Sequence, residues 1–110
     1  MKVPNAERAT IDLAKLRDYC LNPRHPRGRH KARVFRAALG YTARDAEALR
    51  DAILAAVPTL EARSAAKDEF GRRYVVDCPV AGPRGSGVVR TAWIVPYGAK
   101  VPHLTTCFVL

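Results

Sequence analysis

The order of apolar and polar residues divides the chain into a helical first half and a stranded second half. In the first half apolar residues recur at helical spacing, and in the second they alternate with polar residues or form short runs between turns. Helices are expected at about residues 12–21, 29–39 and 42–57, and strands at about residues 60–66, 72–78, 88–95 and 103–109. This pattern predicts an α+β fold with about three N-terminal helices packed on one face of a four-stranded antiparallel meander.

Residues with special backbone preferences mark the predicted helix ends. Asp12 can cap the first helix, and Asn22-Pro23 ends it because the residue before proline avoids helical backbone. Gly40 suits the left-handed position after the second helix. Thr42 and Asp45 have the spacing of a capping box at the start of the third helix. No linker interrupts this series, so residues 1–110 are expected to form a single domain.

Length and apolar content limit the class of protein. The chain has 110 residues, of which 48% are hydrophobic, enough for a packed core. No apolar run approaches the roughly 18 residues of a membrane-spanning helix, and the N-terminus lacks the apolar centre of a signal peptide. We therefore expect a cytoplasmic protein without membrane contact. The pattern does not indicate an oligomeric state.

The cysteines indicate free thiols. The chain has three of them, Cys20, Cys78 and Cys107, each in an apolar segment and none in a CxxC pair. Such residues are typical of buried thiols in a reducing compartment. Cys20 is close in sequence to His25 and His30, but no second cluster completes a tetrahedral zinc site. Neither a metal nor a cofactor is expected.

The net charge of the chain indicates the kind of partner that it binds. Lysine and arginine total 19 and acidic residues total 10, which gives a formal charge of +9. A domain of this kind attracts polyanions, of which nucleic acid is the commonest. The cations concentrate in residues 22–36, a stretch without a single acid. Its six cations are Arg24, Arg27, Arg29, Lys31, Arg33 and Arg36.

The start of the second helix is a candidate oxyanion site. Gly28, the expected N-cap, has no side chain to occupy the free N–H groups of the first turn. These groups and the helix dipole favour a phosphate, to which Arg27, Arg29 and Arg33 can add charge. Arg72, in the second strand, can join Arg90 around another phosphate. The structural alternative for the whole stretch is a solvated basic loop.

Two histidines are the first candidates for acid–base chemistry. His25 lies in a proline-bounded loop, and His30 lies in the first turn of the second helix. A neutral imidazole at either position could act as a base or donate a hydrogen bond. The alternative is that each histidine packs against the domain or faces water.

Lys31 and Arg90 complete the catalytic candidates. Lys31 lies at the edge of the apolar helix face, from which it either extends to water or reaches inward toward the sheet. Arg90 lies in the third strand, on the face opposite Thr91 and Trp93. An arginine there needs water, an anion or a carboxylate. A cross-strand ion pair with Asp77 or Glu61 is the structural alternative.

These residue types suit RNA cleavage through the 2′-hydroxyl. That reaction needs a base, an acid and a cation, which histidine, lysine and arginine supply without a metal. The first hypothesis is therefore a metal-independent endoribonuclease of the toxin type. The second is a module that binds nucleic acid or a protein without catalysis. A third is a structural partner of an acidic protein, and an antitoxin-like partner also fits the first hypothesis.

Short motifs run through the chain and support a resemblance. They are Pro4-Asn5-Ala6-Glu7, Leu16-Arg17-Asp18-Tyr19, Leu21-Asn22-Pro23, His25-Pro26, Gly28-Arg29-His30-Lys31-Ala32-Arg33-Val34-Phe35, Leu39-Gly40, Arg90-Thr91-Ala92-Trp93 and residues 102–110. With them the chain resembles a family of small bacterial proteins of unknown function, which brings no activity with it.

A looser resemblance concerns the fold. Residues 19–23, Gly28, Phe35 and Leu39-Gly40 resemble a motif of the barnase, EndoU, colicin and RelE-like ribonuclease toxins. Those domains place helices before a four-stranded antiparallel sheet. The resemblance implies a similar fold more directly than a similar activity.

Overall fold

A computed structural model describes all residues from Met1 to Leu110. Its helical elements are η1 (Ala6–Arg8), α1 (Leu13–Lys15), η2 (Leu16–Cys20), α2 (Arg29–Leu39), η3 (Ala43–Asp45), α3 (Ala46–Ala56) and η4 (Val57–Thr59), and its strands are β1 (Arg63–Ser64), β2 (Gly71–Ala81), β3 (Ser86–Pro96) and β4 (His103–Val109). The strands form one antiparallel sheet in the order β1-β2-β3-β4. The predicted α+β meander, with its helices before its strands, is confirmed.

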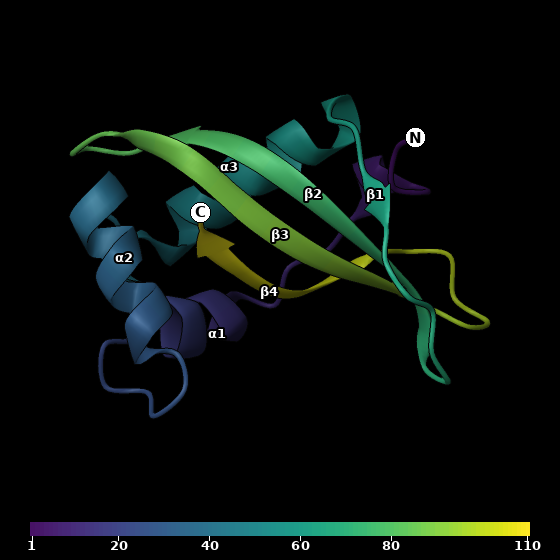
Figure 1. Cartoon of the computed structure of the whole chain (residues 1–110), viewed down its shortest axis with the longest axis horizontal. Coiled ribbons are helices and arrows are strands. Elements are labelled where there is room, and N and C mark those ends of the chain that lie inside the picture. Colours follow the sequence, from purple (N-terminus) through teal and green to yellow (C-terminus); the bar gives the residue numbers. More distant parts are fainter.

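The helices do not form one even layer. In Figure 1, α3 lies behind β2 and β3, whereas α2 stands beside the C-terminal end of β4. Val34 of α2 borders the same hollow as Phe108 of β4, whose register partner is Arg90. Because Arg90 is on the face turned away from the core, α2 flanks the edge of the sheet as well as its inner side. None of the helices has the length and apolar character needed to cross a membrane.

The core lies between the sheet and the helices. Phe35 of α2, Ile53 of α3 and Trp93 of β3 are completely buried in it. Thr91 is the one buried polar residue, and its hydroxyl donates to the Val76 carbonyl at 2.7 Å and accepts from Trp93 Nε1 at 2.7 Å. A buried hydroxyl with both partners costs little, so the predicted alternation of strand β3 is kept.

The three cysteines are free and buried, as predicted. Hydrogen bonding to the neighbouring Cys20 sulfur and burial raise the pKa of the Cys107 thiol well above its ordinary value. Burial likewise raises the pKa of Cys78. These two thiols therefore remain protonated and act as small apolar core groups.

The first predicted helix is less regular than expected. Asp12 caps it, since its carboxylate accepts from the Ala14 N–H at 3.0 Å. After Lys15 the backbone widens into the π-turn η2, in which the Leu21 N–H donates to the Leu16 carbonyl. Such wide turns are rare inside helices and frequent at functional sites.

The first predicted strand is much shorter than residues 60–66. β1 consists of Arg63 and Ser64, which pair only with Val75 and Tyr74. Both β1 residues are exposed, so no apolar burial extends the pairing. β2 is longer than predicted and includes Pro79, which lies beyond the end of β1. No strand pairs with β2 on that side at Pro79, so the N–H that proline lacks removes no hydrogen bond from the sheet.

Candidate nucleic-acid interface

Helix α2 carries a stripe of arginines beside its buried face. Phe35 and Leu39 are fully buried against the core. Arg29, Arg33 and Arg36 are spaced by four and three residues, so they share one side of the helix, as predicted. The sequence periodicity that buries the apolar face therefore also gathers these cations.

The arginine stripe borders a cavity of about 600 Å³ between α2 and the segment that follows it. We call this cavity the arginine pocket. It is lined by Leu21, Pro23, Arg29, Ala32, Arg33, Arg36, Tyr41, Thr42, Ala43 and Arg44. Four of these residues are cations and none is an acid, so the pocket surrounds an apolar floor with positive charge.

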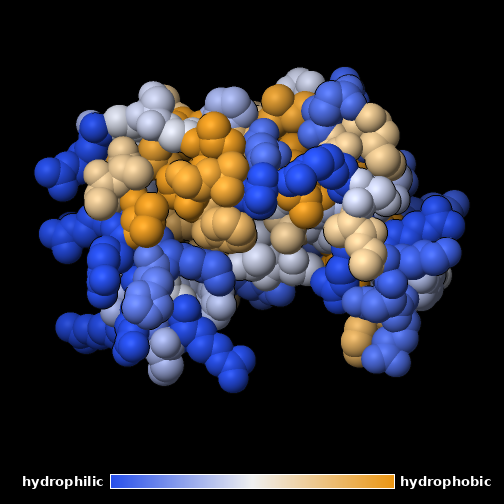
Figure 2. Space-filling model, viewed as in Figure 1, coloured by the Kyte–Doolittle hydropathy of each residue, from blue (hydrophilic) through white to orange (hydrophobic).

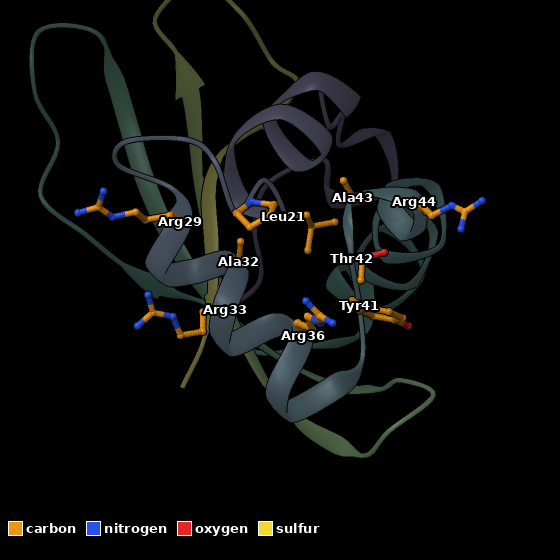
Figure 3. Close-up of a pocket in the computed structure, with 10 residues that line it drawn as sticks. Leu21, Arg29, Ala32, Arg33, Arg36, Tyr41, Thr42, Ala43 and Arg44 are labelled. Carbon is orange, nitrogen blue, oxygen red and sulfur yellow. The ribbon is translucent and has the colours of Figure 1, made fainter.

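Figure 3 shows where the charged groups lie. The guanidinium of Arg36 lies near Tyr41 over the middle of the arginine pocket. The guanidinium groups of Arg29 and Arg33 lie on one flank, and that of Arg44 lies on the other. Of the four, only the Arg36 guanidinium lies over the pocket, while the other three extend away from its apolar side chains, such as Leu21.

No carboxylate neutralises these cations. The side-chain ion pairs of the chain engage Arg17, Arg50, Arg63, Arg73 and Arg90. Between Asp18 and Asp45 the sequence has seven cations and no acid, whereas the other residues hold 12 cations and all 10 acids. Most of the formal charge of +9 therefore belongs to this one segment. Figure 2 shows hydrophilic residues gathered over α2 and the loop before it.

The N-terminus of α2 is partly occupied by the side chain of His25, in the loop before the helix. Gly28 is the N-cap, as predicted, but its N–H donates to His25 Nδ1 at 3.0 Å. His25 Nδ1 also accepts from the Arg27 N–H at 3.0 Å, and the His25 carbonyl accepts from Arg29. The Gly28 N–H is therefore not free, and the phosphate site expected around the first turn of α2 stays a prediction. A β-carbon at Gly28 would collide with the Tyr19 carbonyl, so close packing explains the glycine.

His25, Tyr19 and Lys31 form a contact cluster. The Tyr19 and His25 rings meet edge to face, with 4.6 Å between centroids. Lys31 Nζ donates to the Tyr19 hydroxyl at 3.2 Å and lies 5.0 Å from the ring centroid. Lys31 thus reaches η2, neither free in water nor directed at the sheet. Because His25 Nδ1 accepts two backbone N–H groups, the proton of the neutral ring is on Nε2.

His30 lies apart from this cluster. It is exposed and borders a shallow hollow together with Lys31, Val34, Phe108 and Val109. His25 borders another hollow, which contains Asp12 and Asp18. The two histidines therefore share no cavity, and the acidic lining of the second hollow suits a polyanion less well than the arginine pocket does.

Arg90 is occupied by an ion pair. Its Nε and one terminal nitrogen donate to the two carboxylate oxygens of Asp77 at 2.8 and 3.0 Å. This bond holds the pKa of the Asp77 carboxyl below its usual range. The Asp77 pair predicted as the structural alternative for Arg90 is confirmed, and a phosphate-stabilising role for Arg90 stays a prediction.

The structure does not bring Arg72 and Arg90 together, as their predicted joint phosphate site requires. Arg72 pairs with Val95, whereas Arg90 pairs with Asp77, five residues further along β2. An odd separation places Arg72 and Asp77 on opposite faces of the strand. Arg72 borders a separate hollow at the far end of the sheet with Tyr97 and Lys100.

The helical periodicity of α2 predicts one wall of the arginine pocket but not the other. Arg29 and Arg33 were expected ligands, and both line it. Arg44 and Tyr41 come from the opposite wall, and no periodicity links them to α2. The only early sign was the acid-free sequence, which extends past α2 to Arg44. No group of three or more histidine, cysteine or acidic side chains is arranged to hold a metal ion.

Comparison with known protein families identifies the domain. The model of the family described as Domain of unknown function (DUF6883) matches residues 2–110, nearly the whole chain. The chain belongs to the DUF6883 family. Searches of curated proteins and of solved structures found no match to this DUF6883 domain. The relation to ribonuclease toxins therefore stays a prediction.

Proposed function

We propose that this DUF6883 domain binds RNA through the acid-free basic surface of residues 22–44. The observation that carries the proposal is the arginine pocket, where Arg29, Arg33, Arg36 and Arg44 line one cavity without a carboxylate. Unpaired guanidinium groups match phosphate oxygens in geometry as well as in charge. The three buried free thiols support a reducing, cytoplasmic location for this function.

Binding of this kind is dominated by release of counterions from the RNA. Each phosphate contact lowers the logarithm of the affinity by about 0.7 for each logarithmic unit of salt on a single strand. Arg29, Arg33 and Arg36 therefore supply a slope of about 2 if each meets one phosphate. The contacts are to the backbone, so they attract any sequence.

The test compares two sets of arginines that differ in pairing. A variant with Arg33→Ala and Arg36→Ala is expected to bind a short labelled RNA about tenfold or more weakly, with a smaller salt slope. Its matched control carries Arg63→Ala and Arg73→Ala, which removes the same charge from ion-paired sheet positions. Fluorescence anisotropy at several salt concentrations measures both. Equal losses for the two variants would reduce the proposal to a general effect of net charge.

Cleavage of the bound RNA is the second candidate function. The observation that favours it is the contact of Tyr19 with both His25 and Lys31, beside the basic surface. In such a reaction a base takes the proton of the 2′-hydroxyl, and the 2′-oxygen attacks phosphorus. The 5′-oxygen leaves with a proton from an acid, and a 2′,3′-cyclic phosphate remains. His30 is exposed and borders one hollow with Lys31, so these two side chains suit the base and the acid, whereas His25 lies in a separate hollow.

Incubation with RNA in EDTA separates the two candidates. Cleavage predicts a 2′,3′-cyclic phosphate product that is lost with His30→Ala and with a 2′-O-methyl substrate. Intact RNA after hours, with salt-sensitive binding retained, rejects cleavage and leaves the binding function. An acidic protein that displaces the RNA would be a competitor of the antitoxin type.

A further inference from the structure

The floor of the arginine pocket differs from what phosphate binding alone requires. Leu21, Ala32 and Ala43 line it together with the rings of Pro23 and Tyr41. A site for a phosphate alone would present polar donors, such as backbone N–H groups. A volume of about 600 Å³ is instead within the range of cavities that hold small molecules with apolar surface. The pocket therefore fits a ligand unit that is part flat and apolar, part anionic.

The polar groups on the inner wall are already used. The Tyr41 hydroxyl donates to the Ala81 carbonyl at 3.2 Å. The Thr42 N–H and hydroxyl both donate to the Asp45 carboxylate, at 2.8 and 3.2 Å. These atoms are not free to read the edge of a base. The wall can therefore contact the apolar face of any ring, and it does not distinguish one base from another.

The guanidinium groups at the rim complete the fit. A planar guanidinium can stack on a base and also bind the neighbouring phosphate. Arg36 lies over the middle of the pocket, and Arg33 lies on its flank. A nucleotide with its base on the apolar floor would therefore meet cations on the side where its phosphates lie.

The unpaired cations continue beyond the pocket at both ends of α2. Arg24 and Arg27 precede the helix, and Arg84 packs against Gly40 at its C-terminal end. The helix between them has 11 residues, about 16 Å at its usual rise. A track of this length matches a ligand whose charges repeat evenly, as in a nucleic-acid strand. A compact acidic peptide would leave its ends unused.

We propose that the arginine pocket holds an unpaired base of single-stranded RNA, with the adjacent phosphates on Arg33 and Arg36. This inference rests on the proposed RNA-binding function and names its substrate class. Bases inside a duplex are stacked and paired, so they cannot enter the pocket without unpairing. The domain therefore selects single strands without selecting their sequence.

The experiment changes the ligand first, so that its outcome does not depend on protein folding. Anisotropy measures binding of one short RNA as a single strand, as a duplex, and with abasic sugars in place of its bases. Stacking of one base predicts that the single strand binds about five- to a hundredfold more tightly than the abasic strand. The duplex has a denser charge, but its paired bases cannot reach the pocket floor, so the floor adds nothing to its affinity.

The matching protein variant fills the pocket. Ala43→Leu adds bulk at a half-buried pocket residue, and Ala48→Leu adds the same bulk at an exposed position of α3. We expect Ala43→Leu to bind the normal and abasic strands alike, while Ala48→Leu keeps the wild-type preference. Circular dichroism confirms that both variants are folded.

The outcomes distinguish the inference from the function on which it rests. If wild-type protein binds single, duplex and abasic strands equally with a steep salt slope, the base pocket is overturned and RNA binding stands. If no strand binds with a salt slope, the proposed function fails as well. Tighter binding of an acidic peptide with spaced leucines than of any RNA would overturn both in favour of a protein partner.

Discussion

The α2 surface and the outer face of the sheet are both rich in arginine. The arginines of that sheet face are paired with carboxylates, whereas those of α2 are not. On the sheet, Arg73 contacts Asp68, and Arg90 contacts Asp77. On α2, Arg29, Arg33 and Arg36 contact no carboxylate and line one side of an apolar cavity. An arginine by itself thus indicates little about binding. The local lack of acids is what distinguishes the basic surface.

The difference arises from the two backbone periods. The sheet register places Asp77 directly opposite Arg90, so the charges on neighbouring strands neutralise one another. On α2 none of the residues three and four apart from each arginine is an acid. Each charge on the helix therefore faces solvent, where an anionic ligand can reach it.

The largest effect on stability is expected from a substitution that disturbs the packing between η2 and α2 but removes no charged residue. Gly28→Ala places a β-carbon against the Tyr19 carbonyl, and relief requires a backbone shift between η2 and α2. Overpacking of this kind is expected to cost about 3 kcal/mol of unfolding free energy. Gly98→Ala is the control, because Gly98 has a φ of 80° but no neighbour within 4 Å, so only about 1–2 kcal/mol of strain is expected. Urea unfolding that ranks Gly98→Ala as equally costly would contradict the packing.

A second prediction makes α2 resemble the sheet by adding an acid to it. Ala37→Glu places an exposed carboxylate one turn after Arg33. Stability should change by less than about 0.5 kcal/mol, whereas RNA affinity should fall about tenfold. Ala48→Glu adds the same charge to exposed α3 and should weaken RNA binding much less. Similar losses in the two variants, measured by anisotropy, would show that only net charge matters.

A third prediction breaks the neutralisation on the sheet. Asp77→Asn leaves Arg90 without its carboxylate and should cost about 0.5–1 kcal/mol, the upper end for partly exposed ion pairs. RNA affinity should not fall, because Arg90 is outside the arginine pocket. Thermal unfolding in the presence and absence of RNA measures both quantities.

Acid titration sharpens the same comparison. The folded protein lowers the pKa of Asp77, so the stabilisation is present at neutral pH. It is lost as the pH falls below about 4 and through the folded pKa. The stability difference between wild type and Asp77→Asn should therefore shrink in acid. A difference that stays constant down to the lowest pH would mean that the pair contributes through packing alone.

The smallest effect on RNA affinity is expected at Arg44, on the wall of the arginine pocket opposite α2. Arg44 lines the arginine pocket, but its guanidinium lies on the flank opposite Arg33. Arg44→Ala should weaken RNA binding less than about threefold, below the loss expected of a direct phosphate contact. A loss as large as that of Arg33→Ala in parallel titrations would extend the binding track across the pocket.

Periodicity was sufficient to predict the strand faces and the arginine stripe, since both depend on the regular geometry of one element. It could not predict the cap that His25 provides for Gly28, because a loop side chain makes that bond across irregular backbone. It also missed Arg44, which meets α2 only through tertiary packing. The short strand β1 was overestimated because the propensity of residues 60–66 was not matched by burial.

Glycine contacts fix both ends of α2. Gly28 lies on the Tyr19 carbonyl at one end, and Gly82 lies on the Leu39 carbonyl at the other. The Arg84 N–H also donates to the Leu39 carbonyl. An RNA that binds at this helix would meet a preorganised backbone, so the conformational entropy that the protein loses on binding is mainly that of the arginine side chains. The rate of association should then follow electrostatic attraction, with no folding step to slow it.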